Sequence, residues 1–388
     1  MRKNKVRLGV SVYPEQETIE QIDSYLALAS KYGFTKVFTS LFSVDGTKEE
    51  VFNYFKGFCD IAHKYGMIVS GDANTEFFKK MGASETDIHI FKEMGLDILR
   101  MDGCYFDDRD VILINNEEGI KIEMSSGFIQ AIDQAIDHGA KVENMAVCHN
   151  FYPGRYTGAD LKTIMDINEH WKAKGVLSAI FISSQVPGTH GPWPISQGLP
   201  TLEDHRELPV DVQLKHMVAM DNIDEVLFGN AFASEEEFAL IQKTMDAIYI
   251  NVPKRTDVSE LLANFIPNGN ITRIPFKIDL AEGISELEKS YLFNHVHTAG
   301  EYIYYMLRSR WTRQMDEIEP RTCDKEYFHK GDVVIVNSNC HHYRGEVQIV
   351  MTDMKNDGER NFVGRISEDE MFLLDHIKQS DAFGFIAK

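Results

Sequence analysis

The chain of 388 residues is too long for one ordinary domain. Its net charge of −20 argues against nucleic acid or an anionic membrane surface as a partner, because the field of the whole protein repels polyanions. With 43% hydrophobic residues it can bury a large core, and none of its apolar runs approaches the roughly 20 residues that a membrane span needs. The cysteines, 5 in number, are scattered as in reducing compartments, and the apolar run behind the basic N-terminus is too short for a signal peptide, so we expect a cytoplasmic protein.

From residue 7 onward, short apolar runs alternate with segments of helical period, and several of these segments end in a glycine typical of a helix stop. Eight such strand–helix units over roughly 250 residues predict an α/β fold, a (β/α)8 TIM barrel. The expected strands are 7–12, 35–39, 67–71, 97–101, 120–124, 142–147, 176–182 and 225–228. The expected helices include 15–31, 48–65, 85–94, 127–137, 160–174, 210–220 and 235–247.

An open doubly wound sheet is the alternative, but no Gly-x-Gly-x-x-Gly follows the first strand, where a dinucleotide would bind. Near residue 251 the pattern changes to strand-like runs joined by turn-rich stretches, at 271–280, 329–336, 346–351 and the C-terminal tail. We therefore expect a barrel domain over residues 1–251 and a smaller β-rich domain over residues 252–388.

The active site of a barrel lies at the carboxyl ends of its strands, where this sequence places several charged residues. Asp72 ends the third strand, and Arg100 and Asp102 end the fourth. Alternation along the fifth strand turns Glu123 to the same face as the polar residues of its neighbour. Paired carboxylates among hydroxyl-binding groups favour glycosyl transfer to water, in which one acid protonates the leaving oxygen and the other attacks or activates water. A buried ion pair between Arg100 and Asp102 is the structural alternative.

Two polar loops follow the sixth and seventh expected strands. Cys148 to Gly158 carries donors suited to an anionic ligand, since a guanidinium matches phosphate or carboxylate bidentately. The loop 185–206 is rich in proline and glycine, which fix its shape, and Trp193 could stack on a sugar or plug a gap. Glu203 is a reserve catalytic candidate that could instead cap the next helix. Binding candidates in these loops and at other strand ends are Tyr13, Asn74, His149, Asn150, Tyr152, Arg155, Tyr156, Thr157, His190 and Arg206.

Other chemistries are less well supported by the pattern. The histidines lack metal-ligand spacing, and adjacent side chains in Asn339 to His342 would point apart on a strand, so we expect no metal and no cofactor. No serine lies in a nucleophile elbow. A Schiff-base aldolase or isomerase would need a lysine at a strand end, and Lys121 lies mid-strand.

Taken together, six motifs resemble one bacterial family, filed as "outer surface protein" or under an uncharacterised-domain label and associated with 6-phospho-N-acetylmuramidase activity. The resemblance covers nearly the whole chain. It implies a TIM barrel followed by a cyclophilin-like β domain. The motifs are Gly9-x-Ser11-x-Tyr13, Phe38 to Leu41, Asp72 to Asn74, Leu99 to Gly103, His149 to Pro153 with Arg155 to Gly158, and Gly191-Pro192 followed by Gly198 to Arg206.

The resemblance further implies a cytoplasmic glycosidase of peptidoglycan recycling. Its substrate would be a phosphorylated amino-sugar disaccharide, N-acetylmuramic acid 6-phosphate linked β-1,4 to N-acetylglucosamine. Asp72 and Asp102 are the first catalytic candidates, with Glu123 and Glu203 in reserve. A sugar-phosphate lyase or isomerase, and a sugar-phosphate binding protein without chemistry, remain the alternative functions.

In the C-terminal domain, an arginine-rich cluster could cover the barrel mouth, contact a second subunit in a homodimer, or only cover a helix. A structural or substrate-lid role is expected for it, and the cyclophilin-like fold does not by itself imply prolyl isomerase activity. The cluster consists of Arg308, Arg310, Trp311 and Arg313.

Overall fold

The computed structural model describes residues 5–41, 44–256, 259–301, 304–313 and 316–388, so the basic start of the chain at residues 1–4 lies outside the described residues. The chain divides into two compact units, one formed by Val6–Gln242 and the other containing Lys243–Lys388.

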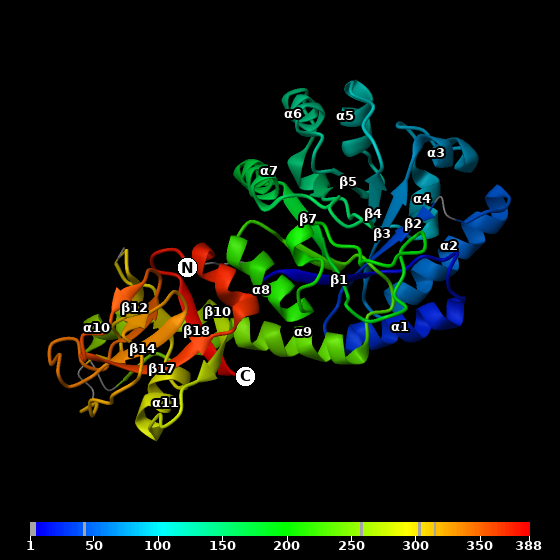
Figure 1. Ribbon diagram of the computed structural model, residues 1–388. Helices are drawn as coiled ribbons and strands as arrows, with labels where there is room; N and C mark the ends of the chain where they lie inside the picture. The colour runs from blue at the N-terminus through cyan, green and yellow to red at the C-terminus, as the bar shows by residue number, and fades with distance from the viewer. Residues whose placement is uncertain (1–4, 42–43, 257–258, 302–303, 314–315) are drawn as a thin grey trace. The chain divides into compact units, whose positions relative to one another are not determined.

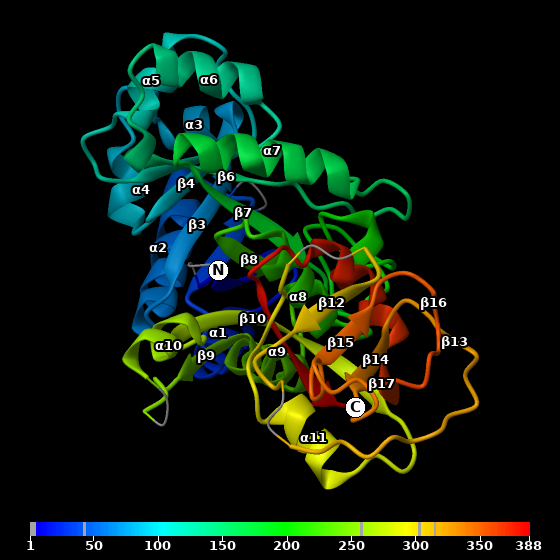
Figure 2. The same ribbon diagram turned by 90° about the vertical axis from the view of Figure 1, so that its left-hand side faces the viewer.

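The first unit is a closed parallel barrel in which each strand pairs with the next in sequence and β1 pairs with β8 (Figures 1 and 2). The predicted TIM barrel is therefore confirmed, with all the expected strands within a few residues of their places. The strands are β1 (Arg7–Ser11), β2 (Lys36–Ser40), β3 (Ile68–Ala73), β4 (Ile98–Met101), β5 (Lys121–Ser125), β6 (Met145–Cys148), β7 (Leu177–Ile182) and β8 (Glu225–Phe228).

Helices surround these strands, and capping residues fix several of their starts. Thr18 and Thr47 each form a capping box with the residue three positions later. The helix-stop glycines predicted from sequence, such as Gly95 and Gly175, have positive φ angles. The helices are α1 (Ile19–Lys31), α2 (Lys48–Lys64), α3 (Thr75–Met81), α4 (His89–Met94), α5 (Asp108–Ile114), α6 (Ile129–Asp137), α7 (Leu161–Lys174), α8 (Val210–Met220) and α9 (Glu235–Ile248), with 3₁₀ turns η2 (Val142–Asn144) and η3 (Glu203–His205).

Helices α3 and α5 were not predicted from the sequence, and the helix predicted at 85–94 is longer than α4, which has six residues. Both missed helices have seven residues, which is too short for helical periodicity to stand out. Their signals were the caps: Asn74 accepts from the amide of Phe77 at 2.8 Å, and Asp107 accepts from the amide of Arg109 at 3.0 Å.

The barrel interior has an apolar part and a charged part. The apolar cluster lies towards the carboxyl ends of the strands and includes Phe38, Phe181 and Leu227. Elsewhere in the interior, Lys36 on β2 contacts Glu123 on β5 at 2.8 Å and Glu225 on β8 at 2.6 Å. These strands are not neighbours, so both ion pairs cross the barrel.

The C-terminal unit is built on a β-sheet with the order β11-β18-β10-β17-β14-β15-β12, and β9 pairs with β10. This confirms a separate β-rich domain. The strands are β9 (Tyr249–Val252), β10 (Gly269–Leu280), β11 (His297–Thr298), β12 (Met306–Ser309), β13 (Tyr327–Phe328), β14 (Asp332–Val336), β15 (Val347–Val350), β16 (Met354–Lys355), β17 (Arg360–Ile366) and β18 (Ala382–Ala387), with helices α10 (Glu260–Phe265), α11 (Glu286–Phe293) and the 3₁₀ helix η4 (Glu368–His376).

Of the helices in the described ranges, none is both long and apolar enough to cross a bilayer.

Candidate functional site

A hollow of about 650 Å³ opens at the carboxyl ends of the barrel strands, and we call it the mouth pocket. Its wall combines carboxylates, one arginine and aromatic rings, the composition of a site for a polar ring-shaped ligand. Its lining residues are Tyr13, Glu15, Phe38, Ser40, Asp72, Arg100, Asp102, Asn150, Phe151, Tyr152, Pro192 and Trp193.

Asp72 is the buried carboxylate of the mouth pocket. Its Oδ1 accepts a hydrogen bond from Arg100 Nη1 at 2.8 Å, across the β3–β4 pair in which the two residues are in register. Burial raises the pKa of Asp72 to about 6, and the Arg100 charge only partly offsets this effect, while Asp102 and Glu123 add to it. A carboxyl group with that pKa can hold a proton near neutral pH and give it to a leaving group.

Asp102 lines the same pocket but is exposed to solvent. Its amide donates to the Ala73 carbonyl at 3.0 Å, which ties the end of β4 to the end of β3 and keeps the two acids close. One acid is thus buried with a raised pKa and the other is solvated, an asymmetry that separates an acid from its partner carboxylate in glycosidases.

Arg100 connects Asp72 to the loop after β6. Its Nη2 donates to Asn150 Oδ1 at 2.6 Å, and its guanidinium lies 5.8 Å from the centre of the Phe38 ring. Asn150, a predicted binding residue, is therefore held in the wall of the mouth pocket. Arg100 itself is only 5% exposed, so its charge stabilises mainly the carboxylate of Asp72.

Glu123 lies deeper in the barrel than the mouth pocket. It is 1% exposed and bonded to Lys36 and, at 3.3 Å, to the Ser70 hydroxyl. It is not among the residues that line the pocket. The geometry favours a structural role for Glu123, with an indirect effect on the pKa of Asp72, over direct contact with a substrate.

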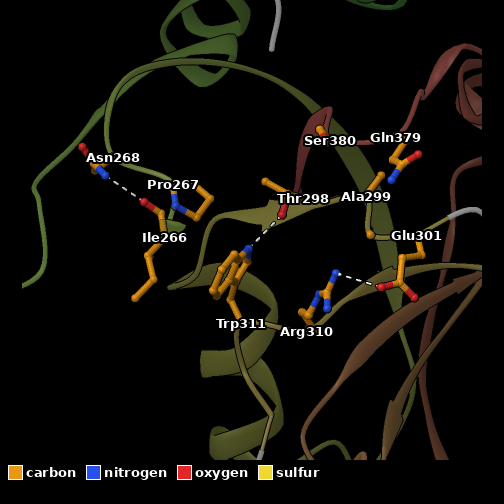
Figure 3. Close-up of a pocket in the computed structure, with 11 residues that line it drawn as sticks. Ile266, Pro267, Asn268, Thr298, Ala299, Glu301, Arg310, Trp311, Gln379 and Ser380 are labelled. Carbon is orange, nitrogen blue, oxygen red and sulfur yellow. Dashed lines mark hydrogen bonds and ion pairs between the residues drawn. The ribbon is translucent and has the colours of Figure 1, made fainter. Parts of the chain in front are cut away.

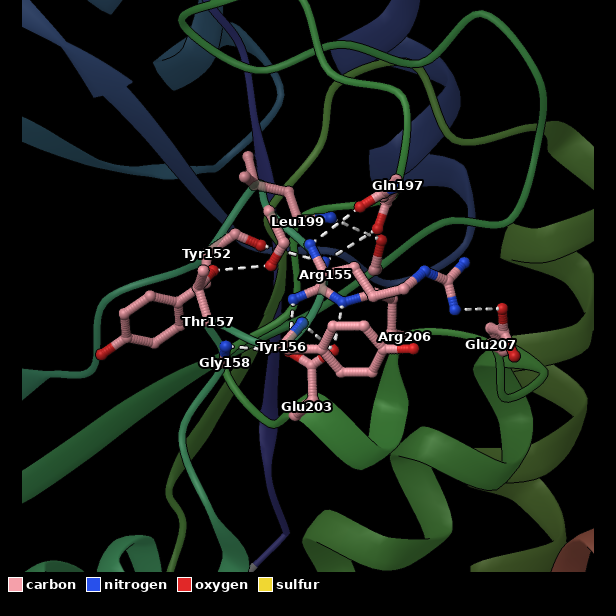
Figure 4. A network of polar contacts seen from close by, with 12 residues as sticks. Tyr152, Arg155, Tyr156, Thr157, Gly158, Gln197, Leu199, Glu203, Arg206 and Glu207 are labelled. Carbon is pink, nitrogen blue, oxygen red and sulfur yellow. Dashed lines mark hydrogen bonds and ion pairs between the residues drawn. The ribbon is translucent and has the colours of Figure 1, made fainter.

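Glu203 and Arg206 join the two polar loops to each other (Figure 4). The Arg206 side chain donates to both carboxylate oxygens of Glu203, at 2.8 and 2.7 Å, and to the carbonyls of Tyr152 and Gln197. Glu203 also accepts from the amides of Tyr156 and Gly158, at 2.7 and 2.8 Å. These hydrogen bonds, of which the one from Arg206 has the largest effect, lower the pKa of Glu203 to about 2. The arrangement favours a structural role for both residues, because Glu203 stays ionised and Arg206 already has its partners.

Arg155, Tyr156 and Thr157 lie on the rim, outside the lining of the mouth pocket. Arg155 forms an ion pair with the exposed Glu207 at 2.7 Å, an interaction that solvent weakens, so its guanidinium can exchange partners. Tyr156 is 84% exposed and has a φ of +67°, and the Thr157 hydroxyl donates to the Gly154 carbonyl. Of these three, only Arg155 carries a charge that could pair with an anionic group, and its partner in this structure is Glu207.

Two further candidates from the sequence face away from the pocket. His149 is buried between the Ser126 hydroxyl, at 2.8 Å, and Asn168 on α7, at 2.7 Å, and burial lowers its pKa to about 4. Asn74 caps α3. Both belong to the packing of the strand ends against the helices.

Tyr13 and His190 belong to a hydrogen-bonded group at the end of β1. Tyr13 is fully buried and donates to the Gly229 carbonyl at 2.5 Å. His190, in the proline-rich loop, contacts Glu17, and that hydrogen bond raises the pKa of His190. Burial raises the pKa of Glu17.

Glu15, Glu17, Phe38 and Phe151 were not among the site candidates predicted from the sequence, although Glu15, Phe38 and Phe151 line the mouth pocket. The signal for Glu15 and Glu17 was their position directly after the first strand, in the same turn as Tyr13.

Within the described ranges, no three His, Cys, Asp or Glu side chains form a cluster that could hold a metal ion.

Comparisons with known proteins identify the family. The profile of the 6-phospho-N-acetylmuramidase N-terminal domain matches residues 8–243, and that of the C-terminal domain matches residues 274–386. The crystal structure of an uncharacterised B. cereus protein is 31% identical with a TM-score of 0.82, covering 98% of this chain and 99% of that one. A conserved protein of unknown function from Enterococcus faecalis has the same fold at 22% identity, with a TM-score of 0.68, and covers 99% of this chain and 97% of that one. No curated protein matches the chain. The two profiles cover nearly the whole chain and each corresponds to one of its units: the protein belongs to the 6-phospho-N-acetylmuramidase family of glycosidases.

Proposed function

We propose that this protein hydrolyses the β-1,4 bond between N-acetylmuramic acid 6-phosphate and N-acetylglucosamine, in the cytoplasm, during peptidoglycan recycling. The observation that carries the proposal is the pair of acids in the mouth pocket, Asp72 buried with a pKa of about 6 and Asp102 exposed. Membership of the family supports the choice of substrate.

In this mechanism Asp72 is the general acid. Its protonated form gives a proton to the glycosidic oxygen as the bond to the anomeric carbon breaks. Arg100 holds one oxygen of Asp72 in place and stabilises the carboxylate that remains after the transfer. Asp102 then acts on the other side of the anomeric carbon. It attacks directly, activates water, or orients the acetamido group whose oxygen attacks.

The remaining side chains of the pocket and rim would bind the two sugars. Asn150 can exchange hydrogen bonds with a hydroxyl or an acetamido group, and Trp193 can lie against a sugar ring. Arg155, with Tyr156 and Thr157 beside it, is the proposed contact of the phosphate or lactyl carboxylate.

The test is product release from the disaccharide with and without its 6-phosphate, measured for the wild type and for Asp72→Asn and Asp102→Asn. Asp137→Asn is the matched control, because Asp137 is an exposed residue at the end of α6 and does not line the mouth pocket. We expect cleavage of the phosphorylated form, lowered by roughly two to four orders of magnitude in either pocket variant and unchanged in the control.

Folded Asp72→Asn protein with wild-type turnover would refute the assignment of the acid. Equal cleavage of both substrates would be consistent with a glycosidase but would refute the role of Arg155 in binding the phosphate.

A further inference from the structure

The C-terminal unit carries a set of cationic side chains that the proposed hydrolysis does not use. They lie at two adjacent hollows of about 430 and 200 Å³, which share Gly300, Glu301 and Arg310 in their walls. We call the two together the basic cleft. Arg308, Arg313, His342 and Tyr343 complete the lining of the smaller hollow.

Two of the guanidinium groups are held rigidly. Arg308 donates to both oxygens of the fully buried Glu346, at 2.5 and 3.0 Å, and Arg313 binds one of the same oxygens. The two guanidinium carbons also lie 4.9 and 4.5 Å from the centre of the Tyr343 ring. Since a guanidinium carries five N–H donors, both groups keep donors for a ligand after Glu346 is satisfied. A cation that is already immobilised loses little side-chain entropy on binding.

Arg310 supplies the accessible charge of the basic cleft. Its side chain is 49% exposed, and its contact with the exposed Glu301 is long, at 3.5 Å. Three guanidinium charges face two carboxylates here, those of Glu301 and Glu346, which leaves a positive balance in a protein of net charge −20. An anion with several oxygens, such as a phosphate, suits such a group of donors.

The larger hollow has a different lining (Figure 3). The Trp311 indole donates to the Thr298 hydroxyl at 2.9 Å, which fixes the orientation of the ring in the wall. Asn268, Gln379 and Ser380 supply amide and hydroxyl groups around it. One aromatic face with scattered hydrogen-bonding groups suits a single sugar ring.

We propose that the basic cleft binds a phosphorylated monosaccharide, with the phosphate on Arg310 and the fixed guanidinium groups of Arg308 and Arg313, and the sugar ring against Trp311. This site lies wholly within the C-terminal unit and is distinct from the mouth pocket, so it adds a second ligand to the protein.

Tryptophan fluorescence tests the proposal directly. The chain has 3 tryptophans: Trp171 is buried in α7, Trp193 lines the mouth pocket and Trp311 lines the basic cleft. In a Trp193→Phe background of the full chain, ligand-dependent emission therefore reports on Trp311. The titrants are N-acetylglucosamine 6-phosphate, N-acetylglucosamine and inorganic phosphate.

We expect a saturable change with the sugar phosphate, none with the unphosphorylated sugar, and binding of inorganic phosphate that is weaker by about tenfold or more. Arg310→Gln should raise the dissociation constant of the sugar phosphate by at least about tenfold, which corresponds to the loss of one charge-assisted hydrogen bond. Arg109→Gln, at an exposed arginine of the barrel unit, is the matched control and should bind like the background. Trp311→Phe should abolish the signal.

No saturable change with the sugar phosphate would overturn the proposal, and so would undiminished binding by Arg310→Gln with native circular dichroism. Inorganic phosphate binding as tightly as the sugar phosphate would overturn the role of the sugar ring. Because the assay involves no turnover, Asp72→Asn in the same Trp193→Phe background should give the same titration, which separates this site from the proposed hydrolysis.

Discussion

Removing the charge of Lys36 tests whether the ion pairs that cross the barrel hold it together. In Lys36→Met the carboxylate of Glu225 keeps Arg7, at 2.5 Å, but Glu123 loses its only ion-pair partner among the described residues while remaining 1% exposed. The methionine fills a similar volume, so the change is mainly electrostatic.

The expected cost follows from the two distances. At an effective dielectric constant of about 20, separations of 2.6 and 2.8 Å correspond to ~6 kcal/mol of attraction per pair, and desolvation of the lysine offsets several kcal/mol of that sum. Breaking a buried pair from one side typically costs about 3–5 kcal/mol, and we expect a loss of that size in the free energy of unfolding at neutral pH.

The assay is urea denaturation of the full chain in a background with Trp193→Phe and Trp311→Phe. The remaining indole, Trp171, donates to the Ser126 carbonyl inside the barrel unit, so its emission follows the barrel. Lys31→Met is the control, because Lys31 pairs with Glu235 at the surface and its loss should leave stability close to the wild type.

A double variant gives a second readout. Glu123→Gln in the Lys36→Met chain removes the buried charge that has lost its partner, so it should restore part of the lost stability at neutral pH. A loss of less than about 1 kcal/mol in Lys36→Met, with no recovery in the double variant, would refute this account of the barrel interior.

Four other results are expected. With Asp72 as a general acid of pKa about 6, the turnover rate should fall as the pH rises through that value, and a flat profile from pH 5 to 8 (roughly) would contradict the role. Glu203→Gln should lower stability by roughly 1–3 kcal/mol at neutral pH, and the difference from wild type should shrink as the pH falls from about 4 towards 2, where wild-type Glu203 itself takes up a proton. Trp193→Ala should raise KM by about tenfold with a smaller effect on kcat, as measured by steady-state kinetics on the phosphorylated disaccharide. Gly229→Ala places a Cβ 2.2 Å from the Leu199 carbonyl oxygen, so thermal unfolding should show a loss of roughly 1–3 kcal/mol and the proline-rich loop should shift.

The sequence predicts the barrel well because the barrel repeats one local signal. Each apolar run followed by an amphipathic segment and a stop glycine predicts one strand and one helix from local sequence. The number of these units then indicates an eight-stranded barrel. Asp72 and Asp102 could be predicted for the same reason, since each directly follows such a run.

The depth of a side chain in the barrel was harder to predict. Alternation assigns Glu123 to the interior face, but its main partner, Lys36, lies 87 residues away on a strand that is not a neighbour. Lys36 was not among the predicted residues, and lysines are rarely buried unless they are paired. Only closure of the barrel brings the two together.

Arg206 illustrates a different limit. An arginine in a polar loop was predicted to bind an anion, and the anion it contacts is Glu203, three residues earlier in the chain. That spacing was visible in the sequence, but the two backbone carbonyls that complete its coordination depend on how the loops fold against each other.

The bonds between these two loops also constrain how the enzyme could be re-engineered. Glu203, from the loop after β7, occupies the space beside Gly158, from the loop after β6, so that a Cβ at Gly158 would lie 2.6 Å from a carboxylate oxygen. A graft of the loop after β6 alone can place a side chain at Gly158 against the Glu203 carboxylate, and a graft of the loop after β7 alone can remove the acceptor of the Tyr156 and Gly158 amides. The two loops should therefore be exchanged together, and libraries that vary Cys148 to Gly158 should vary 197–206 in the same clones.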